Sequence, residues 1–300
     1  MGKRQSRGSG PADWLTDRAV RGLIALALAL PYETRVRFAG WVTRRLVARP
    51  AGYLARAEAN LAQVWPAMDR KTCRRIARAV ADNAGRTLIE NYSTGDFLPR
   101  MAGIEPRGPG LAALEEARTA GRSAILVTGH FGNYEAARAC LVARGFEIGG
   151  LYRPMANRFF NAHYVRTMEA FGGPVFPQGR RGTAGFVRHL KSGGLLVLLI
   201  DQHNRHGPAL DFMGLPARTA LSAAELALRY DAALIPFYAT RQPDGLSFKV
   251  DIEAPVPRDT PEAMTQALND SLAARVRTHP EQWFWVHRRW KTGKVPHAAN

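Results

Sequence analysis

The chain has few cysteines for its length. Its 300 residues contain two, Cys73 and Cys140, which lie 67 positions apart. Two cysteines at this separation form neither a Cys-x-x-Cys metal site nor a disulfide framework, so we expect a reducing environment. The composition, 46% hydrophobic and 22% charged, excludes a disordered or fibrous chain. The length suits one large domain, or one domain with an accessory lobe.

Several catalytic motifs are also missing. There is no Gly-x-Ser-x-Gly elbow, which argues against a hydrolase of that class, and no Gly-x4-Gly-Lys-Ser/Thr phosphate loop. Residues 108–113 match Gly-x-Gly-x-x-Ala, but no strand precedes them and Pro109 would disrupt the turn. A His-Glu-x-x-His zinc helix is absent, and His203 and His206 have no third ligand near them in the sequence. These absences argue against a nucleotide-binding loop and a zinc helix.

A long apolar run is lacking as well. The uncharged segment 22–32 has 11 residues, whereas a bilayer-spanning helix needs roughly 17–25. No small-residue cleavage site follows it, so a secretory signal is not expected. A second apolar patch, residues 38–42 with Trp41, is bracketed by arginines. Such segments are typical of interfacial helices that lie on a membrane; ordinary core helices, or a single span with snorkelling charges, are the alternatives.

Negative charge is scarce. Lys and Arg total 42 against 25 Asp and Glu, a formal charge of +17, and residues 1–100 alone carry a net +10. This excess favours an anionic partner, either a membrane surface or nucleic acid. A helical pattern over 53–92 places five basic residues on one polar side: Arg70, Lys71, Arg74, Arg75 and Arg78. This side would either face phosphates or lipid headgroups or be a solvated helix face.

From about residue 103, short apolar runs alternate with amphipathic segments. We expect strands at 123–128, 146–151, 194–200 and 233–240, an antiparallel edge strand at 246–252, and helices at 134–144, 157–171, 183–191, 219–230 and 262–277. This order predicts an α/β fold with a mostly parallel central sheet flanked by helices. We divide the chain into an N-terminal helical, membrane-associating region, 1–100, and an α/β domain, 101–295.

The end of the first predicted strand carries the clearest chemical signal. The sequence Thr128-Gly-His-Phe-Gly-Asn-Tyr-Glu135 puts His130 just past the strand and Glu135 in the first turn of the next helix. Active sites of open α/β sheets lie at this edge. A neutral imidazole accepts protons well at physiological pH, and a carboxylate on its other nitrogen fixes the tautomer. We therefore expect His130 to activate a substrate hydroxyl, with Glu135 as its orienting carboxylate.

Further polar motifs follow the other predicted strands. They are Tyr152-Arg153-Pro154 with Asn157, the segment 176–182 with Arg180 and Arg181, Asp201-Gln202, the segment 211–216, and the tail Pro280-Glu-Gln-Trp-Phe-Trp-Val-His-Arg-Arg-Trp-Lys291. In this order, and with the His130 motif, they resemble the lysophospholipid acyltransferase superfamily, specifically its lipid A biosynthesis (lauroyl/myristoyl) acyltransferase branch. The resemblance covers residues 15–293, and the tail is its most branch-specific motif.

The resemblance implies transfer of a fatty acyl chain from an acyl carrier protein thioester to a hydroxyl of a lipid A precursor, at the cytoplasmic face of the inner membrane. His130 would be the general base and Glu135 would orient it. Arg153 would donate to the tetrahedral oxyanion, with backbone amides near Gly132 as the alternative donors. No metal and no cofactor are implied, because the thioester already activates the acyl group.

The resemblance also suggests which residues bind substrate: Tyr152, Asn157, Arg180, Arg181, Asp201, Gln202, Arg288 and Arg289. The arginines would meet phosphates, headgroups or the acidic carrier protein, or be structural; Asp201 would orient loops around His130 or cap a turn. The implied partners are the acyl carrier protein, an anionic lipid and a membrane surface, and not nucleic acid.

Other functions remain as alternatives. The same chemistry would serve another glycolipid acceptor, such as a mannosylated phosphoinositide, or an aminolipid. A non-catalytic basic protein that binds lipid or nucleic acid is a different class, and the sequence contains no recognisable nucleic-acid reader motif.

Overall fold

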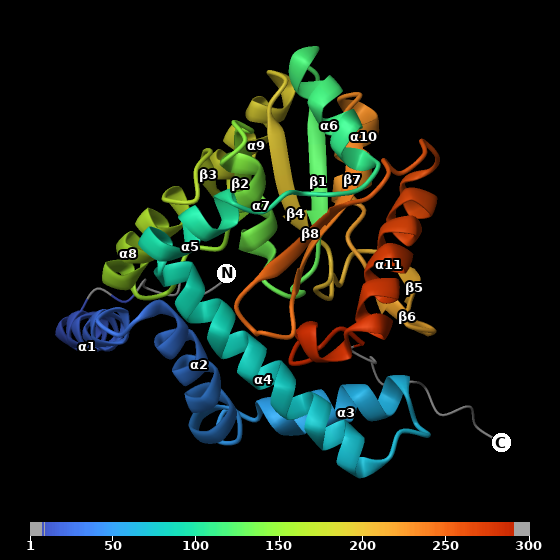
Figure 1. Cartoon of the computed structure of the whole chain (residues 1–300). Coiled ribbons are helices and arrows are strands. Elements are labelled where there is room, and N and C mark those ends of the chain that lie inside the picture. The colour runs from blue at the N-terminus through green and yellow to red at the C-terminus, as the bar shows by residue number, and fades with distance from the viewer. Residues whose placement is uncertain (1–7, 9, 291–300) are drawn as a thin grey trace.

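The computed structural model describes residue 8 and residues 10–290. Its centre is a six-stranded sheet in the order β3-β2-β4-β1-β7-β8 (Figure 1). Neighbours from β3 to β7 pair in parallel, and β8 pairs antiparallel with β7. The predicted α/β fold with a mostly parallel sheet and an antiparallel edge is confirmed. The strands are β1 (Ala124–Thr128), β2 (Ile148–Tyr152), β3 (Val175–Pro177), β4 (Leu195–Leu199), β7 (Ala233–Arg241) and β8 (Phe248–Ile252).

Helices cover both faces of this sheet because its strands are apolar on both sides. β1 is buried along its whole length. Ala124 and Leu126 enter a core with α5 (Thr94–Ala102), α6 (Gly110–Thr119) and α7 (Tyr134–Val142). Ile125 and Val127, on the opposite face, pack with α9 (Arg180–Lys191), α10 (Ser222–Arg229) and α11 (Pro261–Thr278). This alternation is what a strand buried between two helical layers requires.

The structure adds strands that the sequence did not predict. β3 is three residues long, and β5 (Ala209–Phe212) with β6 (Leu215–Arg218) forms a separate antiparallel hairpin. The hairpin turn is Met213-Gly214, with both residues at positive φ. Exposed residues alternate with more buried ones along β5 and β6, so these strands carry no continuous apolar run.

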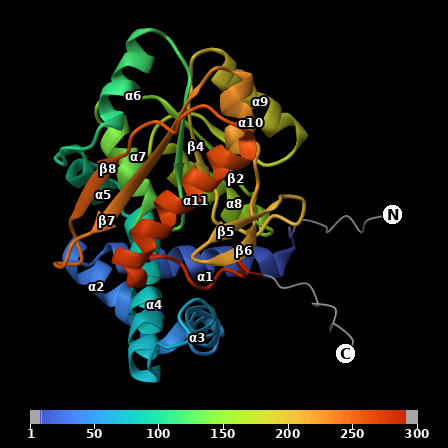
Figure 2. The ribbon, with the colours of Figure 1, turned by 90° about the vertical axis from the view of Figure 1, so that its right-hand side faces the viewer.

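The N-terminal helices lie beneath the sheet domain in Figures 1 and 2. They are α1 (Pro11–Leu28), α2 (Tyr32–Val42), a π-helical turn (Thr43–Val47), α3 (Tyr53–Val64) and α4 (Arg70–Tyr92). Tyr32 and Val36 of α2 and Ile89 of α4 share one apolar core with β1 and α7. The division of the chain at residue 100 stays a prediction. The last residues of the predicted α/β domain, 291–295, lie outside the described part of the chain. The remaining helices are α8 (Arg158–Glu169) and a 3-10 turn (Pro280–Gln282).

Over residues 8 and 10–290, the structure contains no helix that is both long and apolar enough to cross a bilayer. Residues 22–28 of the predicted apolar segment 22–32 form the end of α1, whose first half carries Asp13, Asp17 and Arg18, and residues 29–32 lead into α2. Attachment of this region to a membrane stays a prediction.

Candidate active site

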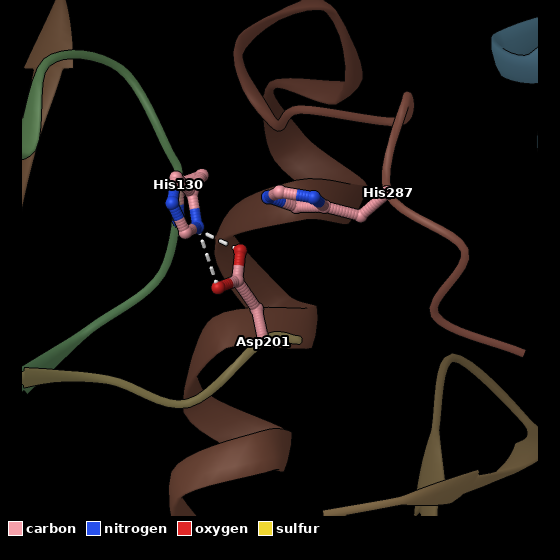
Figure 3. Close-up of side chains that lie close together, drawn as sticks. All are labelled: His130, Asp201 and His287. Carbon is pink, nitrogen blue, oxygen red and sulfur yellow. Dashed lines mark hydrogen bonds and ion pairs between the residues drawn. The ribbon is translucent and has the colours of Figure 1, made fainter. Parts of the chain in front are cut away.

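Two polar side chains meet at the carboxyl edge of the sheet, where β1 and β4 lie side by side. Because the two strands pair in parallel, the residues that follow them leave the sheet at the same edge. His130 Nδ1 lies 2.8 Å from Asp201 Oδ1, and the His130 backbone N–H donates to Asp201 Oδ2 at 2.7 Å. These contacts fix the imidazole and the carboxylate in one orientation (Figure 3).

Asp201 is completely buried, and its Oδ2 also accepts a hydrogen bond from Trp283 Nε1 at 2.9 Å. Burial by itself would raise the pKa of the Asp201 carboxyl, but the charge and hydrogen bonds of His130 outweigh it, so the pKa lies below its ordinary value. The carboxylate is therefore ionised at neutral pH and accepts the Nδ1 proton of His130. This tautomer leaves Nε2 of His130 as the nitrogen that takes up a proton.

A second imidazole, that of His287, packs edge-on against His130, with ring centroids 4.4 Å apart (Figure 3). Burial lowers the pKa of His287 to about 4; Asp201 opposes this shift, and His130 and Arg289 add to it. His287 is therefore neutral near pH 7. Its carbonyl accepts a hydrogen bond from Asn60 Nδ2 at 2.8 Å, which ties the tail to α3. The sequence reasoning missed His287, for which the only signal was its place in the branch-specific tail.

The same three side chains contain donor atoms that all lie within 4.8 Å of one another. Two imidazoles and a carboxylate are a set that zinc and related cations accept. A cation bound through Nδ1 of His130 would displace the bond of that nitrogen to Asp201 Oδ1, and Asp201 is already held on its other oxygen by Trp283. The arrangement in the structure is that of a proton-transfer pair.

Glu135, the predicted partner of His130, pairs with Arg138 instead. Glu135 is in the first turn of α7, and its Oε2 lies 3.2 Å from Arg138 Nη1. Arg138 is 1% exposed and needs a buried counter-charge. The orienting contact expected of Glu135 is made by Asp201, because β1 and β4 end side by side while α7 carries Glu135 onto Arg138. The prediction for Glu135 is corrected accordingly, and the loop-orienting alternative for Asp201 describes its position.

Two predicted substrate-binding residues have structural contacts. Asn157 caps α8 by accepting two backbone N–H bonds, and its Nδ2 donates to Asp13 O at 2.7 Å. Arg289 is completely buried and donates to Thr219 Oγ1 at 2.7 Å and to Arg218 O at 2.9 Å. Burial lowers the pKa of Arg289 to about 10. The contacts in the structure give both residues structural roles, and binding of a substrate by either of them stays a prediction.

The other predicted residues lie on the surface around the strand ends. Arg153 follows β2, and its side chain is exposed. Tyr152 is half-buried, and its ring packs against Tyr164 with centroids 6.2 Å apart. Exposed side chains also belong to Arg180 and Arg181 at the start of α9, to Gln202 and to Arg288. Contact of these residues with a substrate stays a prediction.

A cavity of about 360 Å³ lies beside His130. Its lining includes Val80, Ala84 and Leu88 of α4 and Trp283 and Phe284 of the tail. This mostly apolar lining suits a hydrocarbon chain. The tail tryptophans are core residues: Trp283, Trp285 and Trp290 are all buried.

Known proteins resemble the chain over most of its length. The family model for bacterial lipid A biosynthesis acyltransferases matches residues 2–292. The chain is 26% identical over 297 residues to the lipid A biosynthesis lauroyltransferase of Escherichia coli (strain K12), covering 94% of this chain and 93% of the relative. It is 28% identical over 189 residues to the phosphatidylinositol mannoside acyltransferase of Mycobacterium tuberculosis (strain CDC 1551 / Oshkosh), covering 60% of this chain and 58% of the relative.

A lipid A biosynthesis acyltransferase of Haemophilus influenzae is 24% identical over 188 residues, covering 62% of this chain and 59% of the relative. These relatives are all named as acyltransferases. Since the family model spans nearly all of the 300 residues, this chain belongs to the bacterial lipid A biosynthesis acyltransferase family.

Proposed function

We propose that this protein transfers a fatty acyl chain from an acyl carrier protein thioester to a hydroxyl of a lipid A precursor, late in lipid A assembly. The observation that carries the proposal is the 2.8 Å contact between His130 Nδ1 and Asp201 Oδ1 at the carboxyl edge of the sheet, beside an apolar cavity. A base poised over an apolar cavity is what O-acylation by a lipid chain requires.

The proposed reaction needs one base and no added reagent. Nε2 of His130 takes the proton of the acceptor hydroxyl as its oxygen attacks the thioester carbonyl. Asp201 stabilises the resulting imidazolium through Nδ1. The tetrahedral intermediate then collapses, the C–S bond breaks, and His130 returns the proton to the departing thiolate. The products are an ester and a free thiol.

The oxyanion of this intermediate needs a hydrogen-bond donor. The backbone amides of residues 130, 131 and 132 already donate, to Asp201 Oδ2, to Gly129 O and to Gln282 O. Their engagement weighs against the amide alternative, so Arg153 remains our proposed donor. Tyr152, Arg180, Arg181, Gln202 and Arg288 remain proposed contacts to the anionic lipid or the acidic carrier protein.

The N-terminal helices support a membrane-surface location, which we propose to be the cytoplasmic face of the inner membrane. Large apolar side chains are exposed on them: Trp14, Leu15, Leu23, Leu26, Leu30, Phe38, Trp41, Leu46, Val47 and Leu88. Val47 and Leu88 also line the cavity beside His130. Val47 and Leu88 are therefore the points at which an acyl chain would pass between the bilayer and the cavity.

Flotation with vesicles tests this location. We expect wild type to float with vesicles that contain anionic lipid and a Leu26→Glu/Trp41→Glu variant to float less, at unchanged thermal stability. High salt should release wild type only in part, because apolar contacts are not screened. Complete release by salt alone would indicate a purely electrostatic attachment.

Mass spectrometry of the lipid product tests the reaction. Purified protein is incubated with carrier-protein thioesters of several chain lengths and a tetra-acylated lipid A precursor. A parallel reaction contains a phosphatidylinositol mannoside, because one relative is named for that acceptor. We expect a new ester on the lipid A precursor with wild type and none with His130→Ala. Equal transfer by His130→Ala would show that His130 is not the base. No transfer by wild type to either lipid would favour a non-catalytic lipid-binding protein, and transfer only to the mannoside would assign the function to the second acceptor class.

A further inference from the structure

The turn that carries His130 rests on a buried ion pair far from it in sequence. Glu90 of α4 is completely buried, and Arg241 of β7 is 7% exposed. Arg241 binds both carboxylate oxygens of Glu90, with Nη2 to Oε2 at 2.8 Å. An arginine–carboxylate pair of this bidentate form is geometrically specific, and removing either partner leaves an unpaired buried charge.

Asn133 joins this pair to the turn. Its Nδ2 donates to Glu90 Oε2 at 2.9 Å, while its Oδ1 accepts the backbone N–H of Glu135 at 3.1 Å and caps α7. Asn133 therefore fixes the point where the turn becomes helix, three residues after His130. Asn133 is completely buried, so solvent water does not reach its side chain to take the place of Glu90.

Gly132 is held from the same side. Its carbonyl accepts hydrogen bonds from Asn83 Nδ2 and Thr87 Oγ1 of α4, both at 3.1 Å. Arg241 Nε donates to Asn83 Oδ1 at 2.7 Å, so the ion pair also orients the side chain that holds Gly132.

The tail closes the network. The Gly132 N–H donates to Gln282 O at 2.9 Å, and the Gln282 side chain exchanges two hydrogen bonds of 2.8 Å with the backbone of Arg241. Gly132 has φ +56°, and a Cβ there would lie 1.9 Å from Ala239 O. The backbone of Gly132 therefore packs directly against β7, and only glycine fits at this position.

We propose that Glu90 is a positioning residue: through Asn133 and Arg241 it holds the His130–Asn133 turn where the His130 imidazole meets Asp201. The inference rests on the proposed function for its activity readout. Burial of a charged network costs free energy unless every member is satisfied, and supporting groups of this kind hold reacting side chains in place. Glu90 acts through other residues and touches no reacting atom.

Two single variants test the proposal. Glu90→Gln removes the charge with little change in shape. Asn133→Ser keeps an oxygen that caps α7 but is too short to reach Glu90. For each, we expect kcat of acyl transfer to fall by about tenfold or more with KM within about twofold, because small misplacements of a base are costly. Asp96→Asn is the control: Asp96 of α5, whose side chain is exposed, pairs with the buried Arg35 of α2. It should lower thermal stability and leave kcat unchanged.

A double variant separates positioning from stability. Glu90→Leu with Arg241→Leu removes both charges, a replacement that often preserves or increases stability. We expect it to regain the melting temperature that Glu90→Gln loses, yet to stay slow, because Asn133 and Asn83 have lost their partners. If kcat returns together with the melting temperature, the pair is only structural and the proposal fails.

A readout without turnover distinguishes this failure from failure of the proposed function. The Nδ1 proton of His130, hydrogen-bonded to Asp201, gives a low-field signal in NMR spectra of histidine-labelled protein. We expect it to shift or broaden in Glu90→Gln and Asn133→Ser, and to stay in place in Asp96→Asn. An unchanged signal in both test variants overturns the positioning role, whether or not the wild type transfers acyl groups.

Discussion

His130 and Asp201 are 71 positions apart in sequence, yet His130 Nδ1 and Asp201 Oδ1 are 2.8 Å apart. The pair exists because β4 lies beside β1 in the sheet. A carboxylate so placed fixes the tautomer of the imidazole and stabilises its protonated form.

Asp201→Asn should lower kcat of acyl transfer by about 10²–10⁴-fold, because an amide cannot stabilise the imidazolium and admits the wrong tautomer. The variant should also lose the low-field Nδ1 proton signal of His130. Glu135→Gln is the control for this signal, since Glu135 contacts Arg138. A signal lost in Glu135→Gln and kept in Asp201→Asn would reverse the assignment of the partner.

Glu135→Gln should reduce the free energy of unfolding by about 1–3 kcal/mol, because it leaves the buried Arg138 guanidinium without its carboxylate. Urea denaturation measures the change. Glu116→Gln is a suitable comparison: its arginine partner, Arg122, is exposed, and surface pairs contribute about 0–1 kcal/mol. Equal effects of the two substitutions would contradict a buried ion pair at Glu135.

Stability should fall as the pH decreases from about 6.5 to about 4. Burial lowers the pKa of His287 to about 4, whereas a histidine in the unfolded chain titrates near 6.5. Between these values the unfolded chain binds a proton that the folded protein does not, so the free energy of unfolding rises with pH across this window. Asp201, whose pKa is also lowered, acts in the same direction below its ordinary pKa of about 4.

Denaturation at several pH values measures this slope. We expect His287→Asn to flatten it, leaving the part due to His163, whose pKa burial also lowers. A slope between pH 5 and 6.5 that is the same in His287→Asn and in wild type would mean that His287 is not buried as described.

The cavity beside His130 should set the length of the acyl chain. Ala84→Phe fills part of the α4 wall, so transfer of long chains should fall by about tenfold or more relative to short ones. Ala79→Phe, at a position of α4 that does not line this cavity, is the control and should leave the preference unchanged. Competition between two thioesters in one reaction gives the ratio directly. Loss of both chain lengths to the same extent would place the acyl chain elsewhere.

The fold was largely predictable because its apolar strands and amphipathic helices alternate clearly along the chain. The partly exposed hairpin β5–β6 carries no such pattern, and β3 is too short to give one. The position of His130 was predictable because it follows a buried strand that the sequence pattern indicates. Its pairing with Asp201 was not, since it depends on the order of strands in the sheet. His287 and the Glu90–Arg241 pair come from the tail, α4 and β7, and no local spacing connects them to His130.

The central claim is that His130 takes the proton of the acceptor hydroxyl. Single-turnover acyl transfer, with donor binding measured separately, tests it most directly in wild type and His130→Gln. The account predicts that His130→Gln binds the donor thioester as wild type does and transfers its acyl chain about 10²–10⁴-fold more slowly. Transfer by His130→Gln at the wild-type rate would contradict it.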